Sequence, residues 1–414
     1  METILKGKVL GINGLGRIGK LSLWYHLQEN YFDAFVINVG REVGKKLDDI
    51  IQVIETDSTY GVLSRFLNGF NKDNLEIKVI DYDLPIISVN GKLIKFLRNA
   101  RNPKDINWSN EGVRLVLDCT GNFVDPTLPA EHNKGSLRGH IESGAEKVIL
   151  SAPFKISDSS KKMPEDSGMF VYGINHLDFD PTKHNIMSAA SCTTTGLAHM
   201  MKPLLADKYT SAIVTASMST IHSTTNTQSI LDSVPKANAS DLRKNRAVMN
   251  NIILSTTGAA KALEYVLPQI KNIGFIADSV RIPTTTVSLI TLNITFHTPL
   301  NSKNEPIINK HYLNDIYKKA AQGNQKDLLI FSERQNVSSD LMGIPAACVI
   351  EGHETHTRTG FLQLSTDKLR EIGCENDIKM PVTHAKIFAW YDNELGSYVN
   401  CLGKLTIYTY QQIK

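Results

Sequence analysis

Short apolar runs alternate with amphipathic segments in the first half of the chain. Residues 8–13 (KVLGIN) and 34–39 (AFVINV) are rich in β-branched residues, which is typical of buried strands. Between them, apolar residues recur at helical spacing over residues 17–29. Further strand-like runs follow at 114–121 and 147–153. Strands that alternate with helices in this way predict an α/β domain with a doubly wound parallel sheet.

The pattern changes in the second half of the chain. Residues 213–222 (IVTASMSTIH) and 284–296 (TTTVSLITLNITF) are long runs rich in β-branched residues. They predict a larger, mostly antiparallel sheet that is covered by helices, and hence an α+β domain. We therefore expect a first domain at residues 1–190, which a C-terminal helix at about 391–414 completes, and a second domain at 191–390.

Composition narrows the classes of function. The 414 residues are 42% hydrophobic and 21% charged, as in globular proteins, and the net charge of +3 gives no support for a nucleic-acid or membrane-surface partner. Five scattered cysteines form neither a disulfide framework nor a zinc pattern, which favours a reducing compartment. The chain shows no signal or transit peptide and no apolar run near the roughly 18 residues of a membrane span. We expect a cytoplasmic protein.

The first predicted strand ends in a glycine-rich turn. Residues 11–19 are GINGLGRIG, so that Gly14, Gly16 and Gly19 have the G-x-G-x-x-G spacing. Glycines at these positions allow a tight strand-to-helix turn and a close approach of the backbone to a pyrophosphate at the helix N-terminus. Because the motif follows a strand and opens a helix, it predicts a Rossmann-type dinucleotide site that also includes Arg17 and Ile18.

The second predicted strand lacks the acid that usually binds the adenosine ribose in such domains. Val39 stands near that place, and Arg41 follows it. Loss of the acid removes repulsion toward a 2′-phosphate, and an arginine can pair with one. The alternative is that Arg41 is merely solvated. The expected cofactor is NAD or NADP, with NADP or dual use left open.

A cysteine and a histidine are candidates for nucleophilic catalysis. Cys192 lies in SAASCTTTG (188–196), and His222 lies in STIHSTTNTQ (219–228). A catalytic thiol needs a nearby base or cation to form thiolate, and histidine is the usual partner. Taken alone, each residue is more often structural, because cysteine among small side chains usually serves as a compact core residue.

The order of these and other motifs resembles that of the phosphorylating glyceraldehyde-3-phosphate dehydrogenases. NGLGRIG, DSTYG, ARNP, CTGNF, SAP, SCTT, HSTTNTQ, STTGAAKA, RIPT and WYDNE follow one another in the family's order over nearly the whole chain. Several motifs in register are far more specific than any one of them. The resemblance implies NAD(P)-dependent oxidation and phosphorylation of glyceraldehyde 3-phosphate to 1,3-bisphosphoglycerate, or the reverse.

The resemblance also implies a role for individual residues. Cys192 would carry a hemithioacetal and then a thioester, with His222 as the base. The family's substrate-phosphate pocket corresponds to Thr225, Thr227 and Arg281. Its pocket for inorganic phosphate corresponds to Ser191, Thr193, Thr257 and Gly258, with Arg281 between the two pockets. Further cofactor contacts correspond to Val39, Arg101, Thr120, Gly121 and Asn393. The implied assembly is a homotetramer in which the loop at 232–246 crosses a subunit interface.

The chain departs from the family pattern in several places. Ala189 and Thr195 replace asparagines that flank SCTT in many members, and Ser397 occupies a tyrosine position next to Tyr398. The chain is also longer than usual, mainly at 155–168 and 341–381, which are predicted to be surface elaborations.

The second of these segments contains His353 and His356 in GHETHTRTG. This spacing is not the H-E-x-x-H zinc pattern, so no metal site is expected.

Three alternatives to the implied function are open. The same chemistry could act on erythrose 4-phosphate, with hydrolysis in place of phosphorolysis, although the retained Thr193 and Thr257 favour attack by phosphate. Semialdehyde dehydrogenases also use a cysteine thioester, but they lack HSTTNTQ and WYDNE together. A non-catalytic binding or regulatory member is a third possibility, against which the intact Cys192 and His222 argue.

Overall fold

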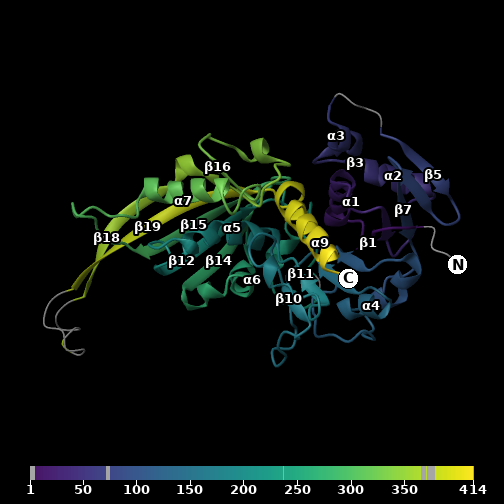
Figure 1. Cartoon of the computed structure of the whole chain (residues 1–414), viewed down its shortest axis with the longest axis horizontal. Helices are drawn as coiled ribbons and strands as arrows, with labels where there is room; N and C mark the ends of the chain where they lie inside the picture. The colour runs from purple at the N-terminus through teal and green to yellow at the C-terminus, as the bar shows by residue number, and fades with distance from the viewer. Residues whose placement is uncertain (1–4, 71–74, 236, 365–369, 371–377, 414) are drawn as a thin grey trace. The chain divides into compact units, whose positions relative to one another are not determined.

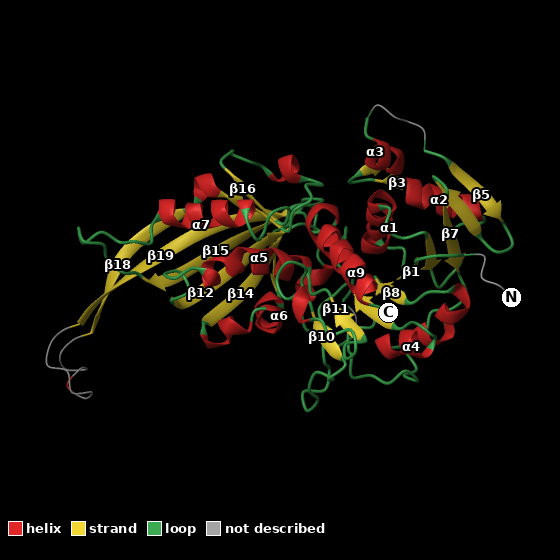
Figure 2. Cartoon of the chain, viewed as in Figure 1, coloured by secondary structure: helices red, strands yellow, loops and turns green. Residues whose placement is uncertain are grey.

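The computed structural model describes residues 5–70, 75–235, 237–364, 370 and 378–413, and the chain divides into two compact units (Figure 1). One unit comprises residues 1–191 and 398–414, and the other comprises residues 192–397. Each unit contains its own large sheet, as the colouring by secondary structure shows (Figure 2).

The first unit is built on a nine-stranded sheet. The strand order is β10 (Ser167–Met169), β11 (Ile186–Ser188), β9 (Lys147–Leu150), β8 (Leu115–Asp118), β1 (Val9–Asn13), β2 (Ala34–Asn38), β7 (Lys92–Leu97), β6 (Ile86–Val89) and β5 (Ile77–Asp81). Pairs from β10 to β7 are parallel, and only the β7–β6 and β6–β5 pairs are antiparallel. The unit also contains α1 (Arg17–Glu29), α2 (Leu47–Glu55), α3 (Leu63–Asn68), α4 (Leu137–Glu142), α9 (Asn400–Gln412) and the short ladder of β3 (Thr56–Asp57) with β4 (Gly61–Val62).

The glycine-rich turn joins β1 to α1 as predicted. All residues of β1, β2 and β8 are buried, as expected for central strands of a parallel sheet. Gly14 has a φ of 96°, which favours glycine. A Cβ atom on Gly19 would lie 1.9 Å from the carbonyl oxygen of Gly14. Only a residue without a side chain therefore lets α1 begin this close to the end of β1.

The second unit is built on an eight-stranded, mostly antiparallel sheet. The strand order is β13 (Ile253–Thr256), β14 (Gly274–Arg281), β12 (Ile213–His222), β15 (Ser288–His297), β19 (Ile378–Tyr391), β17 (Cys348–Glu351) and β16 (Leu329–Ser332), while β18 (His356–Leu364) also pairs with β19. Only β12–β14 and β16–β17 are parallel pairs. The helices are α5 (Cys192–Ala206), α6 (Ala259–Val266) and α7 (Lys310–Gln322). Buried and less buried residues alternate along β15 and β19, so one face of the sheet meets the core.

The fold class predicted from the sequence is confirmed, but three details are wrong. The strand expected from residue 284 begins at Ser288, because Val287 has a positive φ of 62° and interrupts the extended backbone. The segment 341–381 is not simply a surface elaboration, since it contains the fully buried strand β17, which is too short to show a period. The C-terminal helix begins at Asn400 rather than near residue 391, because the chain is still in β19 up to Tyr391.

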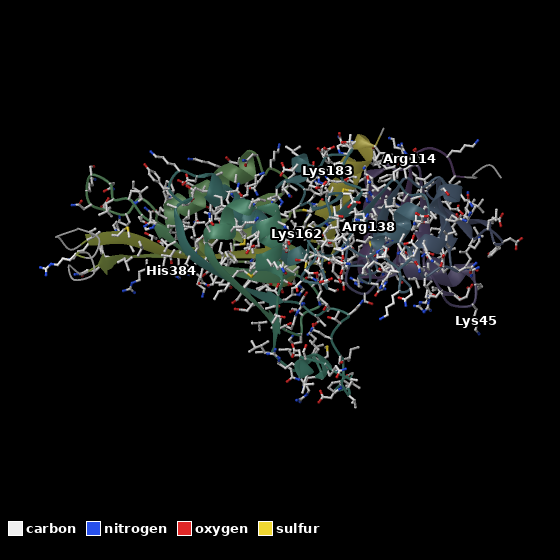
Figure 3. The ribbon with its side chains drawn as sticks, turned by 90° about the horizontal axis from the view of Figure 1, so that it is seen from below. Lys45, Arg114, Arg138, Lys162, Lys183 and His384 are labelled. Carbon is white, nitrogen blue, oxygen red and sulfur yellow. The ribbon has the colours of Figure 1, made fainter. Side chains whose placement is uncertain are left out.

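The two lengthened segments differ in character. Residues 157–162 are exposed, as predicted, and Arg138 anchors this segment through a bidentate ion pair with Asp166 at 2.8 and 2.9 Å (Figure 3, where Arg138 and Lys162 are labelled). In the second segment, β18 and β19 form a long hairpin that carries the labelled His384. Residues 365–369 and 371–377 of this segment lie outside the described residues. Among the described residues, no helix combines the length and apolarity needed to cross a membrane.

Candidate active site

Cys192 is the first residue of α5 in the second unit. The first backbone N–H groups of a helix have no partners within the helix, and its N-terminus carries partial positive charge. The thiol is therefore placed where developing negative charge is stabilised. Its Sγ atom lies 3.6 Å from Nε2 of His222.

His222 is the last residue of β12 and is buried. Its Nδ1 atom lies 2.7 Å from the carbonyl oxygen of Ser223. The carbonyl oxygen of Ser223 can accept a proton from Nδ1, whereas Nη1 of Arg281, 2.5 Å from the same atom, can only donate to it, so the two contacts favour opposite tautomers. In the tautomer with the proton on Nδ1, Nε2 is an acceptor that faces the thiol, which is the arrangement that a general base requires.

Arg281 adds a part-buried positive charge beside this pair. The parallel register of β12 and β14 places His222 opposite Arg281. The Nη1 atom of Arg281 lies 2.5 Å from Nδ1 of His222 and 3.2 Å from the carbonyl oxygen of Ser223. Among the described residues, no carboxylate forms an ion pair with Arg281. A part-buried cation without a counterion makes this end of the sheet suited to an anion.

Burial and the arginine set the protonation states of the pair. Burial, with a smaller contribution from Arg281, lowers the pKa of His222 to about 4. Burial raises the pKa of the Cys192 thiol, although Arg281 and hydrogen bonds with Thr193 act in the opposite direction. Without a ligand, the site therefore holds a neutral imidazole beside a neutral thiol at pH 7. The imidazole is free to take the thiol proton during attack.

Buried hydroxyl groups connect the start of α5 to the sheet. The phenol of Tyr391 lies 2.8 Å from Oγ1 of Thr193 and 2.7 Å from Oγ1 of Thr220. Burial raises the pKa of Tyr391, so the phenol stays protonated. The Thr193 hydroxyl is thus held in place by Tyr391, and the Thr193 backbone N–H near the start of α5 is a second group suited to a phosphate. Sequence reasoning missed Tyr391, although it lies within the WYDNE motif.

The other predicted phosphate ligands lie in two places. Thr225 and Thr227 follow β12, and their hydroxyl groups are 2.9 Å apart. The backbone bond from Thr224 to Thr284 keeps this turn beside the end of β14, where Arg281 lies.

Thr257 and Gly258 precede α6, and the Thr257 hydroxyl accepts a bond from the Ala259 N–H. Thr256 pairs with Asp278, so the register does not bring Thr257 opposite Arg281. Ser191 lies directly before the nucleophile, at the end of the first unit.

The side-chain amide of Asn393 is held in one orientation. Its Oδ1 atom accepts hydrogen bonds from the hydroxyl groups of Ser223 at 2.7 Å, Ser288 at 3.3 Å and Thr286 at 3.4 Å. Asn393 thus uses its oxygen within the protein, and its amide N–H₂ is the group suited to a ligand carbonyl. These hydroxyl donors could not have been assigned to Asn393 from the sequence, because Ser223 follows β12 whereas Thr286 and Ser288 lie at the start of β15.

In the first unit, Asp118 connects the loops that carry the predicted cofactor contacts. This fully buried carboxylate accepts bonds from the Asn13 side chain at 2.8 Å, from the Thr120 hydroxyl at 2.7 Å and from the Thr120 backbone N–H at 3.0 Å. Asn38 then donates to Asn13 at 2.8 Å and to the carbonyl oxygen of Ala100 at 3.0 Å. The ends of β1, β2 and β8 and the turn before Arg101 are therefore joined by one network.

His140 completes this network from α4. Its Nε2 atom lies 3.0 Å from Asp118, and its Nδ1 atom lies 2.9 Å from Nε1 of Trp108. An indole N–H can only donate, so His140 carries its proton on Nε2 and donates to Asp118. The loop of Thr120 and Gly121 is thus held by the carboxylate of Asp118, which accepts hydrogen bonds from Asn13, Thr120 and His140.

Positive charge gathers where the adenosine ribose is expected. Arg41 is exposed after β2, and Nε of Arg101 donates to the carbonyl oxygen of Gly40 at 3.2 Å. Arg98 follows β7, the parallel neighbour of β2, and pairs with Glu42 at 2.8 Å. Sequence reasoning missed Arg98, because only the strand order brings it beside Val39.

On the other side of the glycine turn, Arg17 and Lys20 both pair with the buried Asp57.

Comparisons with known proteins identify the family of the chain. Residues 8–126 match the NAD binding domain of glyceraldehyde 3-phosphate dehydrogenase, and residues 191–393 match its C-terminal domain. The chain is 34% identical over 404 residues to glyceraldehyde-3-phosphate dehydrogenase 2 of Streptomyces avermitilis, covering 98% of this chain and 99% of that protein. It is 31% identical to glyceraldehyde-3-phosphate dehydrogenase 1 of Bacillus cereus, covering 96% and 97% of the two chains. The chain belongs to the glyceraldehyde 3-phosphate dehydrogenase family.

Membership of the glyceraldehyde 3-phosphate dehydrogenase family confirms the predicted resemblance. It makes the protein a family oxidoreductase with a domain for NAD or NADP. The alignment with the Streptomyces protein covers nearly all of both chains, so the extra length does not distinguish this chain from that relative.

The two histidines of the second lengthened segment lie beside Glu354. His353 and His356 approach its two carboxylate oxygens at 3.1 and 3.5 Å. Within the described part of the chain, no group of three or more possible metal ligands was found.

Replacing His222 with asparagine should slow aldehyde oxidation by roughly 10² to 10⁴-fold, because the thiol loses its proton acceptor. The measurement is the pre-steady-state rate of NAD(P)H formation, together with the cofactor Kd, which we expect to stay unchanged. His384→Asn, which changes an exposed histidine in the same unit, serves as the matched control. A loss smaller than tenfold for His222→Asn would show that another group takes the proton.

Proposed function

We propose that the protein catalyses the NAD(P)-dependent oxidation of glyceraldehyde 3-phosphate with inorganic phosphate to give 1,3-bisphosphoglycerate, or the reverse reaction. The observation that carries this proposal is the contact of the Cys192 thiol with Nε2 of His222, at 3.6 Å, beside the guanidinium of Arg281. The named relatives and the matched domains support it.

The first step forms a covalent bond between the enzyme and the aldehyde. As Sγ of Cys192 attacks the carbonyl carbon, the thiol proton passes to Nε2 of His222, and a hemithioacetal results. The backbone N–H of Cys192, at the start of α5, and the protonated imidazole stabilise the developing oxyanion. Arg281, Thr225 and Thr227 hold the substrate phosphate.

The second half of the reaction passes through a thioester. A nicotinamide oriented by the amide of Asn393 would supply the acceptor for the hydride of the hemithioacetal carbon. After the first proton has been released, His222 removes the hydroxyl proton, which leaves the acyl group on Sγ. Inorganic phosphate, held by Ser191, the Thr193 N–H, Thr257 and Gly258, then attacks the carbonyl carbon. The acyl phosphate leaves, and Cys192 regains a proton through His222.

The residues of the first unit fit a dinucleotide. Gly14, Gly16 and Gly19 leave the N-terminus of α1 open to a pyrophosphate, and no Cβ atom stands in the way at Gly16. In this proposal, Arg17, Ile18, Arg101, Thr120 and Gly121 add further contacts, and the amide of Asn393 orients the nicotinamide carboxamide.

Steady-state kinetics test the proposed substrates directly. We expect turnover with glyceraldehyde 3-phosphate to exceed that with erythrose 4-phosphate and to require inorganic phosphate. Both aldehydes should be crossed with NAD and NADP, each with and without phosphate. Equal rates without phosphate would favour the hydrolytic alternative. No turnover with a freshly reduced enzyme would favour a non-catalytic role.

The charge distribution around Val39 supports NADP as well as NAD. We expect Val39→Asp to reduce the ratio of NADP to NAD activity about tenfold, because a carboxylate near a 2′-phosphate costs about 1 kcal/mol or more. The ratio of kcat/KM values for the two cofactors is the measurement. Val39→Asn introduces a side chain of the same size as aspartate but without its charge, so it should leave the ratio nearly unchanged. If both variants change the ratio equally, charge at residue 39 does not select the cofactor.

A homotetramer is the assembly that we propose, in the reducing cytoplasm that a free catalytic thiol requires. The loop after β12 exposes large apolar side chains, among them Leu231 at 77%, Val234 at 90% and Leu242 at 62%. An apolar cluster of this kind marks an association surface.

The double variant Leu231→Lys with Val234→Lys should yield a smaller species in light scattering coupled to size-exclusion chromatography, because charge cannot be buried at an interface. Val337→Lys, at a similarly exposed residue, is the control and should leave the mass unchanged. An unchanged mass for the double variant would place the interface elsewhere.

A further inference from the structure

The residue two positions before the nucleophile has an unusual backbone conformation. Ala190 has a φ of 58°, in the left-handed region that alanine rarely adopts, and it is fully buried. A non-glycine residue in this region requires support from the surrounding structure, and such residues gather at functional sites. The chain passes through Ala190 as it leaves β11 and enters α5 at Cys192.

Two side chains of the first unit hold Ala190 on both sides. The backbone N–H of Ala190 donates to Oγ of Ser188 at 3.1 Å, and that hydroxyl donates to the carbonyl oxygen of Ala152 at 2.6 Å. The phenol of Tyr398 donates to the carbonyl oxygen of Ala190 at 3.1 Å. Ser188 and Tyr398 are both buried, so water does not replace either bond easily.

The position of Tyr398 follows from an irregular turn. Leu395–Val399 form a π-helical turn directly before α9, and such turns re-aim side chains at functional sites. Ser397, the residue before Tyr398, points to a different partner, since its Oγ accepts a bond from the Asp392 N–H at 2.9 Å. The departure at Ser397 and Tyr398 therefore places a phenol, rather than a serine hydroxyl, on Ala190.

We propose that Tyr398 and Ser188 are positioning residues for Cys192, because they hold Ala190 in the left-handed conformation from which the chain enters α5. The rotation at Ala190 sets the direction in which Ser191 and Cys192 continue. The expected effect of this rotation on catalysis rests on the proposed function, but its expected effect on the alkylation rate of the Cys192 thiol does not. Glycine adopts a positive φ without the steric penalty of a Cβ atom, so glycine at residue 190 should make both clamping bonds less necessary.

The test is a set of variants read out by the alkylation rate of Cys192 with iodoacetamide, followed by mass spectrometry. We expect Tyr398→Phe to slow alkylation about tenfold, because it removes a buried hydrogen bond to the carbonyl oxygen of Ala190. Ala190→Gly should stay near the wild-type rate. The double variant, Tyr398→Phe with Ala190→Gly, should recover to within about twofold of Ala190→Gly alone.

Controls separate positioning from general stability. Tyr408→Phe changes a tyrosine on α9, the helix that directly follows the turn of Tyr398, and should leave the alkylation rate unchanged. If Tyr398→Phe does not fold, Ser188→Ala breaks the other clamping bond and should show the same loss and the same recovery with Ala190→Gly. The cofactor Kd should remain unchanged in every variant.

Two results would overturn the proposal. One is an unchanged alkylation rate in both Tyr398→Phe and Ser188→Ala. The other is a loss that Ala190→Gly does not suppress, since a merely structural role would lower the rate equally in both backgrounds. If the wild type alkylates normally but oxidises no aldehyde, the proposed function fails while this inference is still tested.

Discussion

The parallel pairing of β12 with β14 is the constraint on which the candidate active site depends. It places His222 and Arg281 opposite one another at the ends of two neighbouring strands. In a mostly antiparallel sheet, adjacent strands usually end at opposite edges, so two consecutive strand ends would not meet. The parallel pairing of β12 with β14 therefore brings a base and a cation together, and α5 places the thiol 3.6 Å from Nε2 of that base.

Burial and the charge of Arg281 together set the electrostatics of this group. Burial lowers the pKa of His222, and Arg281 lowers it further, whereas burial raises the pKa of the Cys192 thiol against the opposite effect of Arg281. Without a ligand, the pair is therefore neutral. A phosphate-bearing substrate would complete the charge balance that the protein leaves open.

The sequence predicts the fold class, because the glycine turn and the strand patterns are local signals. It does not predict which side chains fix the orientation of Asn393, since Ser223 follows β12 whereas Thr286 and Ser288 lie at the start of β15. Arg98 was missed for the same reason, because the β2–β7 register alone brings it beside Val39. The strand β17 escaped prediction because four residues cannot display a period.

Two buried residues with positive φ, Ala190 and Val287, show where tertiary contacts override local preference. Val287 is β-branched, so its φ of 62° is less favourable than that of alanine, and it lies between Thr286 and Ser288, which both bond to Asn393. Ala190 lies two residues before the thiol and is bonded on both sides. In each case the unfavourable backbone is followed by groups that must point in one direction. Strain and orientation are therefore coupled, because a relaxed strand at either place would turn the next side chain to the opposite face.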